Sequence, residues 1–301
     1  MRAVRQLLLF LTVCLSSQVW GGTVALVLSD SGSAYAEFSS ALSEALLGTN
    51  WRVISTTTGD NMPPVGDSPN LTVTVGSEAL RRTLARGETS LIIATLLPRQ
   101  SYDKLIAEHR RPTGRITAIY LDQPPARQAA FLRHLLPGNK RVGMLVSNET
   151  RSLATPYRQA FNAAGMTLDS EDTDTGDTLL PAINALLPRV GALLAIPDGT
   201  IYQRSNIKPI LISAFRQQRP VIAYSVAFVN AGAMAALHTT ASQIAQQTAE
   251  LITSNPSSLP PPSPPTQFSI AINRTVAQAL NLNPPDEAVL RRAMIADREN
   301  R

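Results

Sequence analysis

The stretch VALVLSD, residues 24–30, has a counterpart in the second half of the chain, VGMLVSN, residues 142–148. In both copies a short apolar run ends at a serine, which is followed by Asp or Asn. An uninterrupted apolar run of this length predicts a strand that is covered on both faces, as in a parallel sheet. We therefore expect the fold to be built from two similar halves.

Later segments of the two halves follow the same order. VTVGSEAL (73–80) corresponds to LLAIPDGTI (193–201), and LIIAT (91–95) corresponds to PVIAYS (220–225). After the first strand, apolar residues from Tyr35 to Leu46 recur at helical spacing. Strands that alternate with helices favour parallel pairing. The prediction is an α/β fold with two doubly wound parallel-sheet lobes, whose first-lobe strands lie at 24–28, 71–75, 91–95 and 116–121.

The C-terminal part departs from this alternation. Residues 244–252 have the pattern of a helix, and NPSSLPPPSPP (255–265) follows it. Proline fixes φ and removes a donor, so this stretch predicts an extended surface connector. Residues 268–273 then alternate like a strand, and residues 274–280 have the pattern of a short helix.

The N-terminus predicts an export signal over residues 1–21. Arg2 and Arg5 precede an apolar run at 7–15, which is too short to span roughly 30 Å of hydrocarbon. Cys14 is the only cysteine of the 301-residue chain, and its lipidation is the alternative to a cleaved signal. Cleavage would leave a chain without cysteine, and we expect a soluble protein of the periplasm.

The sequence shows no signature of catalysis, metal binding or nucleic-acid binding. It has no Gly-x-Ser-x-Gly motif and no glycine-rich phosphate loop, and His109, His134 and His238 lie far apart. Basic residues do not cluster with aromatic residues between them. We expect a protein that is not an enzyme, has no metal or cofactor and does not bind nucleic acid.

Candidate ligand contacts follow from the expected sheets. Ligands of open parallel sheets bind beyond the carboxyl ends of the strands, where helix N-termini direct their N–H groups. The polar and aromatic residues that follow the predicted strands are therefore the candidates. They are Ser29, Asp30, Ser31, Ser33, Tyr35, Gly76, Ser77 and Thr95 in the first half, and Ser147, Asn148, Asp198, Thr200, Tyr224, Ser225 and Phe228 in the second.

Each of these candidates also has a structural interpretation. Ser, Thr, Asp and Asn are the preferred helix N-caps, so Ser31 and Ser77 could cap helices without touching a ligand. Asp198 could cap a helix that begins near Thr200, contact a ligand, or do both. Phe228 is expected either in an aromatic wall for a planar ligand or in the packing of its lobe.

Four segments carry a resemblance to a known family. They are LLPGNKRVGMLVSNET (135–150), RPVIAYSVAFVNAGAMAAL (219–237), QIAQQTAELI (243–252) and FSIAINRTVAQALNL (268–282), and the similarity spans residues 23–282. These segments look like the ABC-transporter substrate-binding family that includes tryptophan-binding lipoproteins. Residues 197–225 further resemble a divergent offshoot of that family.

The resemblance implies the type I periplasmic-binding fold, in which two lobes joined by three crossings hold a ligand between them. It implies one lobe of residues 22–120 plus about 241–265, and another of 121–240 plus about 266–301. It also implies a monomer that delivers a small molecule to an ABC permease. The alternative is a sensory subunit that signals to a membrane kinase or cyclase.

Two loops depart from the family pattern. Many members carry an acidic residue after the strand that matches PVIAY, but SVAFVNAG (225–232) supplies none here. LLPRQS (96–101) replaces the usual Asp-Pro turn after the third strand. An amino-acid ligand is therefore not implied by the resemblance.

Overall fold

The computed structural model describes residues 21–58, 69–87, 89–109, 114–174, 176–254 and 257–299. The predicted signal, apart from Gly21, and Cys14 lie outside these residues. None of the helices in the described ranges is long and apolar enough to cross a membrane.

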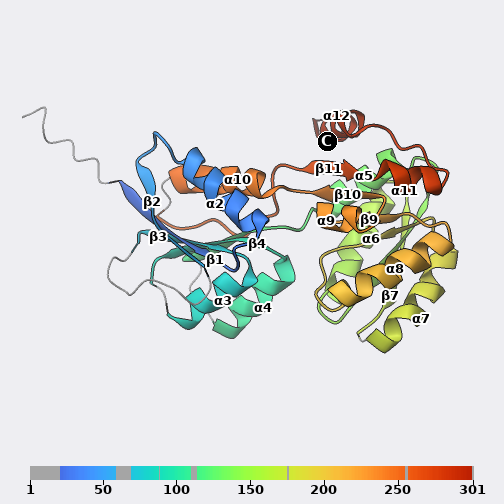
Figure 1. Ribbon diagram of the computed structural model, residues 1–301, viewed down its shortest axis with the longest axis horizontal. Helices are drawn as coiled ribbons and strands as arrows, with labels where there is room; N and C mark the ends of the chain where they lie inside the picture. The colour runs from blue at the N-terminus through green and yellow to red at the C-terminus, as the bar shows by residue number, and fades with distance from the viewer. Residues whose placement is uncertain are drawn as a thin grey trace, which may run out of the picture.

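The first lobe is a five-stranded parallel sheet with the strand order β2-β1-β3-β4-β5 (Figure 1). Helices α2 and α10 cover one face, and α3 and α4 cover the other. The strands are β1 (Gly22–Leu28), β2 (Trp51–Thr58), β3 (Leu71–Val75), β4 (Leu91–Leu97) and β5 (Ile116–Tyr120), and the helices are α2 (Ser33–Ala45), α3 (Ser77–Ala85), α4 (Arg99–His109) and α10 (Ala241–Thr253).

The second lobe is a six-stranded sheet with the order β11-β10-β9-β8-β6-β7, in which β11 runs antiparallel to β10. One apolar core forms with α5, α6, α11 and α12, and the other forms with α7, α8 and α9. The strands are β6 (Arg141–Val146), β7 (Thr167–Asp172), β8 (Ala192–Leu194), β9 (Val221–Ala223), β10 (Ala235–His238) and β11 (Ser269–Ile272). The helices are α5 (Pro125–Leu135), α6 (Ala154–Ala163), α7 (Gly176–Leu186), α8 (Arg204–Arg216), α9 (Val226–Asn230), α11 (Arg274–Ala279) and α12 (Glu287–Glu299), with single 3₁₀ turns at Arg151–Leu153 and Leu187–Arg189.

The two-lobed α/β architecture is confirmed, and the predicted first-lobe strands are present. The fourth strand, β4, continues two residues beyond its predicted end, to Leu97. Neither β2 nor β7 was predicted. Both are edge strands with largely half-buried or exposed residues, so they lack the continuous apolar run that marks a buried strand.

Three segments cross between the lobes, and a polar cluster ties them together. The guanidinium of Arg127 donates to Gln123 Oε1 (2.8 Å) and to the carbonyl of Pro265 (2.9 Å). Gln123 Nε2 donates to Thr239 Oγ1 (2.6 Å), and that hydroxyl donates to the carbonyl of Gln267 (2.9 Å). The crossings after β5, after β10 and before β11 are therefore held in one place.

Candidate functional site

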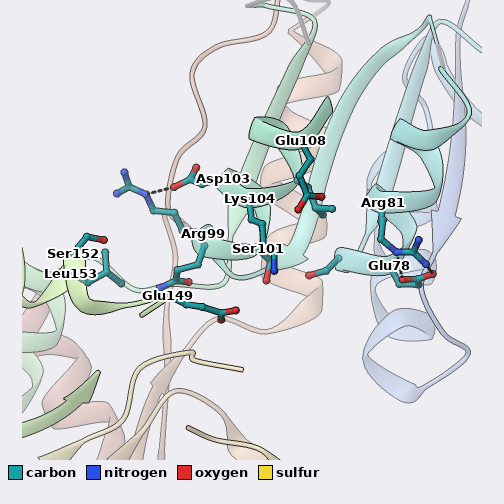
Figure 2. Close-up of a pocket in the computed structure, with 13 residues that line it drawn as sticks. Glu78, Arg81, Arg99, Ser101, Asp103, Lys104, Glu108, Glu149, Ser152 and Leu153 are labelled. Atoms are coloured by element: carbon teal, nitrogen blue, oxygen red, sulfur yellow. Dashed lines mark hydrogen bonds and ion pairs between the residues drawn. The ribbon is translucent and has the colours of Figure 1, made fainter. Parts of the chain in front are cut away.

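A cavity of about 800 Å³ lies between the two lobes (Figure 2). The first turns of α3 and α4 form much of the first-lobe wall, and the turn that follows β6 forms the second-lobe wall. This volume lies within the range of small-molecule sites, which is roughly 300–1,000 Å³. The cavity is lined by Ser77, Glu78, Arg81, Arg99, Gln100, Ser101, Asp103, Lys104, Leu105 and Glu108 from the first lobe and by Glu149, Ser152 and Leu153 from the second.

The cavity walls carry both signs of charge. Glu78 accepts hydrogen bonds from Arg81 Nε (2.9 Å) and Arg82 Nε (2.8 Å), and the bond from Arg81 contributes most to lowering the pKa of the carboxyl. Arg99 Nε lies 3.3 Å from Asp103 Oδ2. Lys104 and Glu149 have no ion pair within the described ranges. A polar or charged molecule therefore finds both donors and acceptors here.

Ser29 and Gly76 together begin α3. Ser29 Oγ accepts a hydrogen bond from the backbone N–H of Ala79 (2.8 Å), so a side chain from the end of β1 caps this helix. Gly76, the N-cap residue, has φ +91°, and a Cβ there would lie 2.5 Å from Ser29 Oγ. Only glycine leaves room for the Ser29 cap. The hydroxyl of Ser29 is thus already used by the protein.

Replacing Gly76 with alanine is expected to destabilise the protein by about 2 kcal/mol, because the backbone strain and the clash with Ser29 add together. Urea unfolding measures the loss. Gly48→Ala is the matched control, since Gly48 also has a positive φ (+74°) but nothing lies within 4 Å of its Cβ position. Equal losses in the two variants would contradict the close contact with Ser29.

The candidate residues around the start of α2 differ in how far they are exposed to solvent. Asp30, Ser31 and Ser33 are exposed, and Asp30 Oδ1 accepts from the N–H of Ser31 (2.5 Å). The N-cap of α2 is Gly32, so Ser31 does not cap this helix. Tyr35 is half-buried, and burial, followed by the charge of Asp30, raises the pKa of its phenol.

Thr95 does not follow its strand as expected. It lies inside β4 with no exposed surface, because β4 extends to Leu97. Its hydroxyl donates to the carbonyl of Thr74 (3.1 Å). This side chain is therefore part of the sheet interior, and we no longer propose it as a ligand contact.

Asp198 is the centre of a buried network in the second lobe. Asp198 is 5% exposed, and its carboxylate accepts four hydrogen bonds. Oδ2 accepts from the hydroxyls of Ser147 (2.7 Å) and Thr150 (2.6 Å), and Oδ1 accepts from the N–H groups of Thr200 and Ile201 (both 2.9 Å). The network joins the loop after β6 to the loop after β8.

The helix expected near Thr200 begins at Arg204, with Gln203 as its N-cap residue. Asp198 therefore closes the turn at residues 199–202 and does not cap α8. Ser147 has no exposed surface and serves this network, whereas Thr200 is half-buried and Asn148 is exposed. The Asn148 amide oxygen accepts from Arg151 Nη1 (2.6 Å).

Three aromatic side chains pack together at the ends of β8 and β9. Tyr202 lies edge-to-face against Phe228 (ring centroids 5.6 Å apart) and Tyr224 (5.9 Å). Phe228 is 2% exposed, so it packs within its lobe. Ser225 Oγ caps α9 by accepting a hydrogen bond from the backbone N–H of Phe228 (3.3 Å). Burial, then the charge of Asp198, raises the pKa of the half-buried Tyr224 to about 12.

Among the fifteen predicted contacts, Ser77 is the one that lines the cavity. The sequence analysis did not identify the cavity residues of α4 or those of the turn after β6. Some of them lie a few residues beyond a strand end, in PRQS (98–101) and NETRSL (148–153). Extending the search through the first turn of each following helix would have found these, but not the cavity residues further along α4, which are Asp103, Lys104, Leu105 and Glu108. Tyr202 was also missed, and its hydroxyl is buried without a partner in the described residues.

Comparison with known proteins supports the two-lobed assignment. Residues 64–295 match the family model described as ABC transporter substrate binding protein. No match is found among curated protein sequences.

Solved structures of similar fold cover nearly the whole chain. A ligand-free, open substrate-binding protein with adhesive properties from Clostridium difficile has a TM-score of 0.66 at 15% identity, over 88% of this chain and 96% of that one. An ABC domain in complex with L-Trp from Streptococcus pneumonia has a TM-score of 0.62 at 16% identity, over 89% and 97% of the chains. A conserved domain protein from Vibrio cholerae has a TM-score of 0.61 at 20% identity, over 90% and 98%.

The structural likenesses establish the fold, which is that of the type I periplasmic-binding proteins. The family match extends over most of the chain and includes both lobes. The chain therefore belongs to the ABC transporter substrate-binding protein family.

Proposed function

We propose that this protein binds a small solute in the cavity between its lobes and delivers it to an ABC permease. The observation that carries the proposal is that both lobes contribute walls to the cavity of about 800 Å³. A ligand that contacts both walls gains more contacts when the lobes approach, so it favours the closed form. The permease then receives the closed, loaded protein.

We also propose that the two lobes move as two bodies, residues 22–120 with about 241–265 and residues 121–240 with about 266–301. The packing of α10 against α2 supports the assignment of residues 241–265 to the first lobe. Ser263 bonds with the backbone of Ala118 and Tyr120 beside β5, and β11 pairs with β10. Motion would then concentrate at the three crossings held by Arg127 and Gln123.

The ligand is proposed to be polar and small. Ser77, Gln100 and Ser101 offer hydroxyl and amide groups on the first-lobe wall, and Glu149 and Ser152 offer a carboxylate and a hydroxyl on the second. The carboxylate of Asp198 is occupied by four donors and is not proposed as a contact. Residues 1–21 are proposed to be removed on export, and the protein to act as a monomer in the periplasm.

A thermal-shift screen tests the proposal, with amino acids including L-Trp, aromatic metabolites, sugars, nucleosides and small anions. A ligand at a hundred times its Kd is expected to add about 2.7 kcal/mol of stability. Gln100→Ala should weaken the response, whereas Ser31→Ala, at an exposed position outside the cavity, should preserve it. A folded protein that responds to no compound of the panel would count against solute binding.

A further inference from the structure

Two unpaired charges line the same cavity from opposite lobes. Lys104 lies on α4 of the first lobe, and Glu149 lies in the turn after β6 of the second. Neither forms an ion pair in the described part of the chain, whereas the neighbouring Arg99 is paired with Asp103. Glu108 of α4 also has no ion pair there, so the first-lobe wall presents one cation and one anion to the Glu149 carboxylate across the space that closure would narrow.

The position of Glu149 suits an approach to α4. Figure 2 shows its side chain extending toward the first turn of that helix. Glu149 is exposed, and its Oε2 lies 3.9 Å from the position that a Cβ on Gly199 would occupy. The carboxylate therefore lies beside the turn at Gly199, at the strand-end edge of its own lobe, and is not buried within it.

The first turn of α4 is ready to accept a negative charge. The backbone N–H of Arg99 is used by Asp122, but those of Gln100 and Ser101 have no acceptor among the described residues. The side-chain amide of Gln100 is also without a hydrogen-bond partner there. Free N–H groups and the helix dipole both favour an anion at this end of a helix.

We propose that Glu149 and Lys104 form a latch between the lobes. When the lobes close, the Glu149 carboxylate pairs with the Lys104 ammonium and approaches the first turn of α4, which stabilises the closed form before any ligand is bound. The latch rests on the proposed function only in requiring that the lobes close. Glu108, one helical turn beyond Lys104 on the same wall, is a like charge that opposes the approach of Glu149.

Disulfide trapping measures closure without a known ligand. Ser101→Cys and Ser152→Cys place one thiol on each wall of the cavity, in the full chain with Cys14→Ser. The rate at which the two thiols join under mild oxidation reports how often the lobes meet. Reaction with neutral iodoacetamide corrects for any change in the reactivity of each thiol.

The variants Glu149→Gln and Lys104→Gln are each expected to slow trapping by about two- to fivefold, as is 1 M NaCl. The exchanged pair Glu149→Lys with Lys104→Glu should restore the rate relative to either single reversal. Glu108→Gln, the matched control, should not slow it. A rate that is independent of both charges, an exchanged pair no faster than the single reversals, or no trapping at all would overturn the latch.

The outcome is separable from that of the ligand screen. Charge-dependent trapping in a protein that binds no compound of the panel would support the latch and leave solute binding unsupported. A ligand response combined with charge-independent trapping would overturn the latch alone.

Discussion

Replacing Asp198 with alanine is expected to lower the free energy of unfolding by about 4 kcal/mol, because four donors lose their acceptor together. The hydroxyls of Ser147 and Thr150 have no exposed surface, so water cannot replace the carboxylate without entering the lobe. Asp198→Asn should lower the free energy of unfolding by about half as much, because the amide keeps one oxygen acceptor and places its NH₂ group against either the two hydroxyls or the two N–H groups. Hydrogen exchange should rise in the loops at residues 147–150 and 199–202.

Asp30→Ala is the control for this prediction. Asp30 also follows a strand, but it is exposed, and its Oδ1 bonds with its neighbour Ser31. Its loss should change stability by less than about 0.5 kcal/mol. Urea unfolding followed by circular dichroism compares the two variants. If Asp198→Ala were as stable as the natural protein, the carboxylate would not be holding the two loops together.

The second large effect is a dependence of stability on pH that arises from Asp122. This residue follows β5, and its Oδ2 accepts from the backbone N–H of Arg99 at the start of α4 (2.7 Å). Burial raises the pKa of its carboxyl from 3.8 to about 6, against the opposing effect of that hydrogen bond and the Arg99 charge. The folded state therefore keeps its proton up to a higher pH than the unfolded state does.

The sign of the effect follows from this difference. Between pH 4 and 6 the folded state binds more protons than the unfolded state, so stability falls as the pH rises through this window. A shift of this size corresponds to about 3 kcal/mol. Asp122→Asn keeps an acceptor for Arg99 but has no charge, so it should match the natural protein near pH 4 and exceed its stability above pH 7.

Chemical unfolding at a series of pH values measures this prediction. Glu44→Gln is the control, since Glu44 is an exposed carboxylate on α2 and is not among the charges that act on Asp122. It should leave the decline of stability between pH 4 and 6 unchanged. A decline of the same size in Asp122→Asn would assign the pH dependence to another group.

The buried strands could be predicted because a strand covered on both faces has an uninterrupted run of apolar and β-branched residues. Residues 71–75 are all buried, and their apolar and β-branched side chains mark a strand covered on both faces. The edge strand β7, TLDSED, buries little beyond Leu168 and has the composition of a loop. Its place is determined by pairing with β6, a long-range contact that leaves little trace in its own residues.

The candidate site was predicted less completely, for a geometric reason. The rule that ligands lie beyond strand ends points to the edge of each sheet at which the cavity lies, but it does not say which side chains line that cavity. Ser147 and Asp198 follow strands and Thr95 lies inside one, and all three use their side chains in hydrogen bonds within the protein. Lys104 and Glu149 reach the cavity because of where α4 and the loop after β6 meet across the lobes. That meeting depends on the relative placement of two sheets, which local sequence does not encode.

The central claim, that two lobes close on a ligand, is tested most directly by small-angle X-ray scattering. The protein would be measured alone and with a saturating amount of a compound that raises its melting temperature. The account predicts that the radius of gyration falls on binding, because the cavity narrows as the lobes approach. A ligand that stabilises the protein while leaving the scattering unchanged would place the binding site within a single lobe and contradict closure.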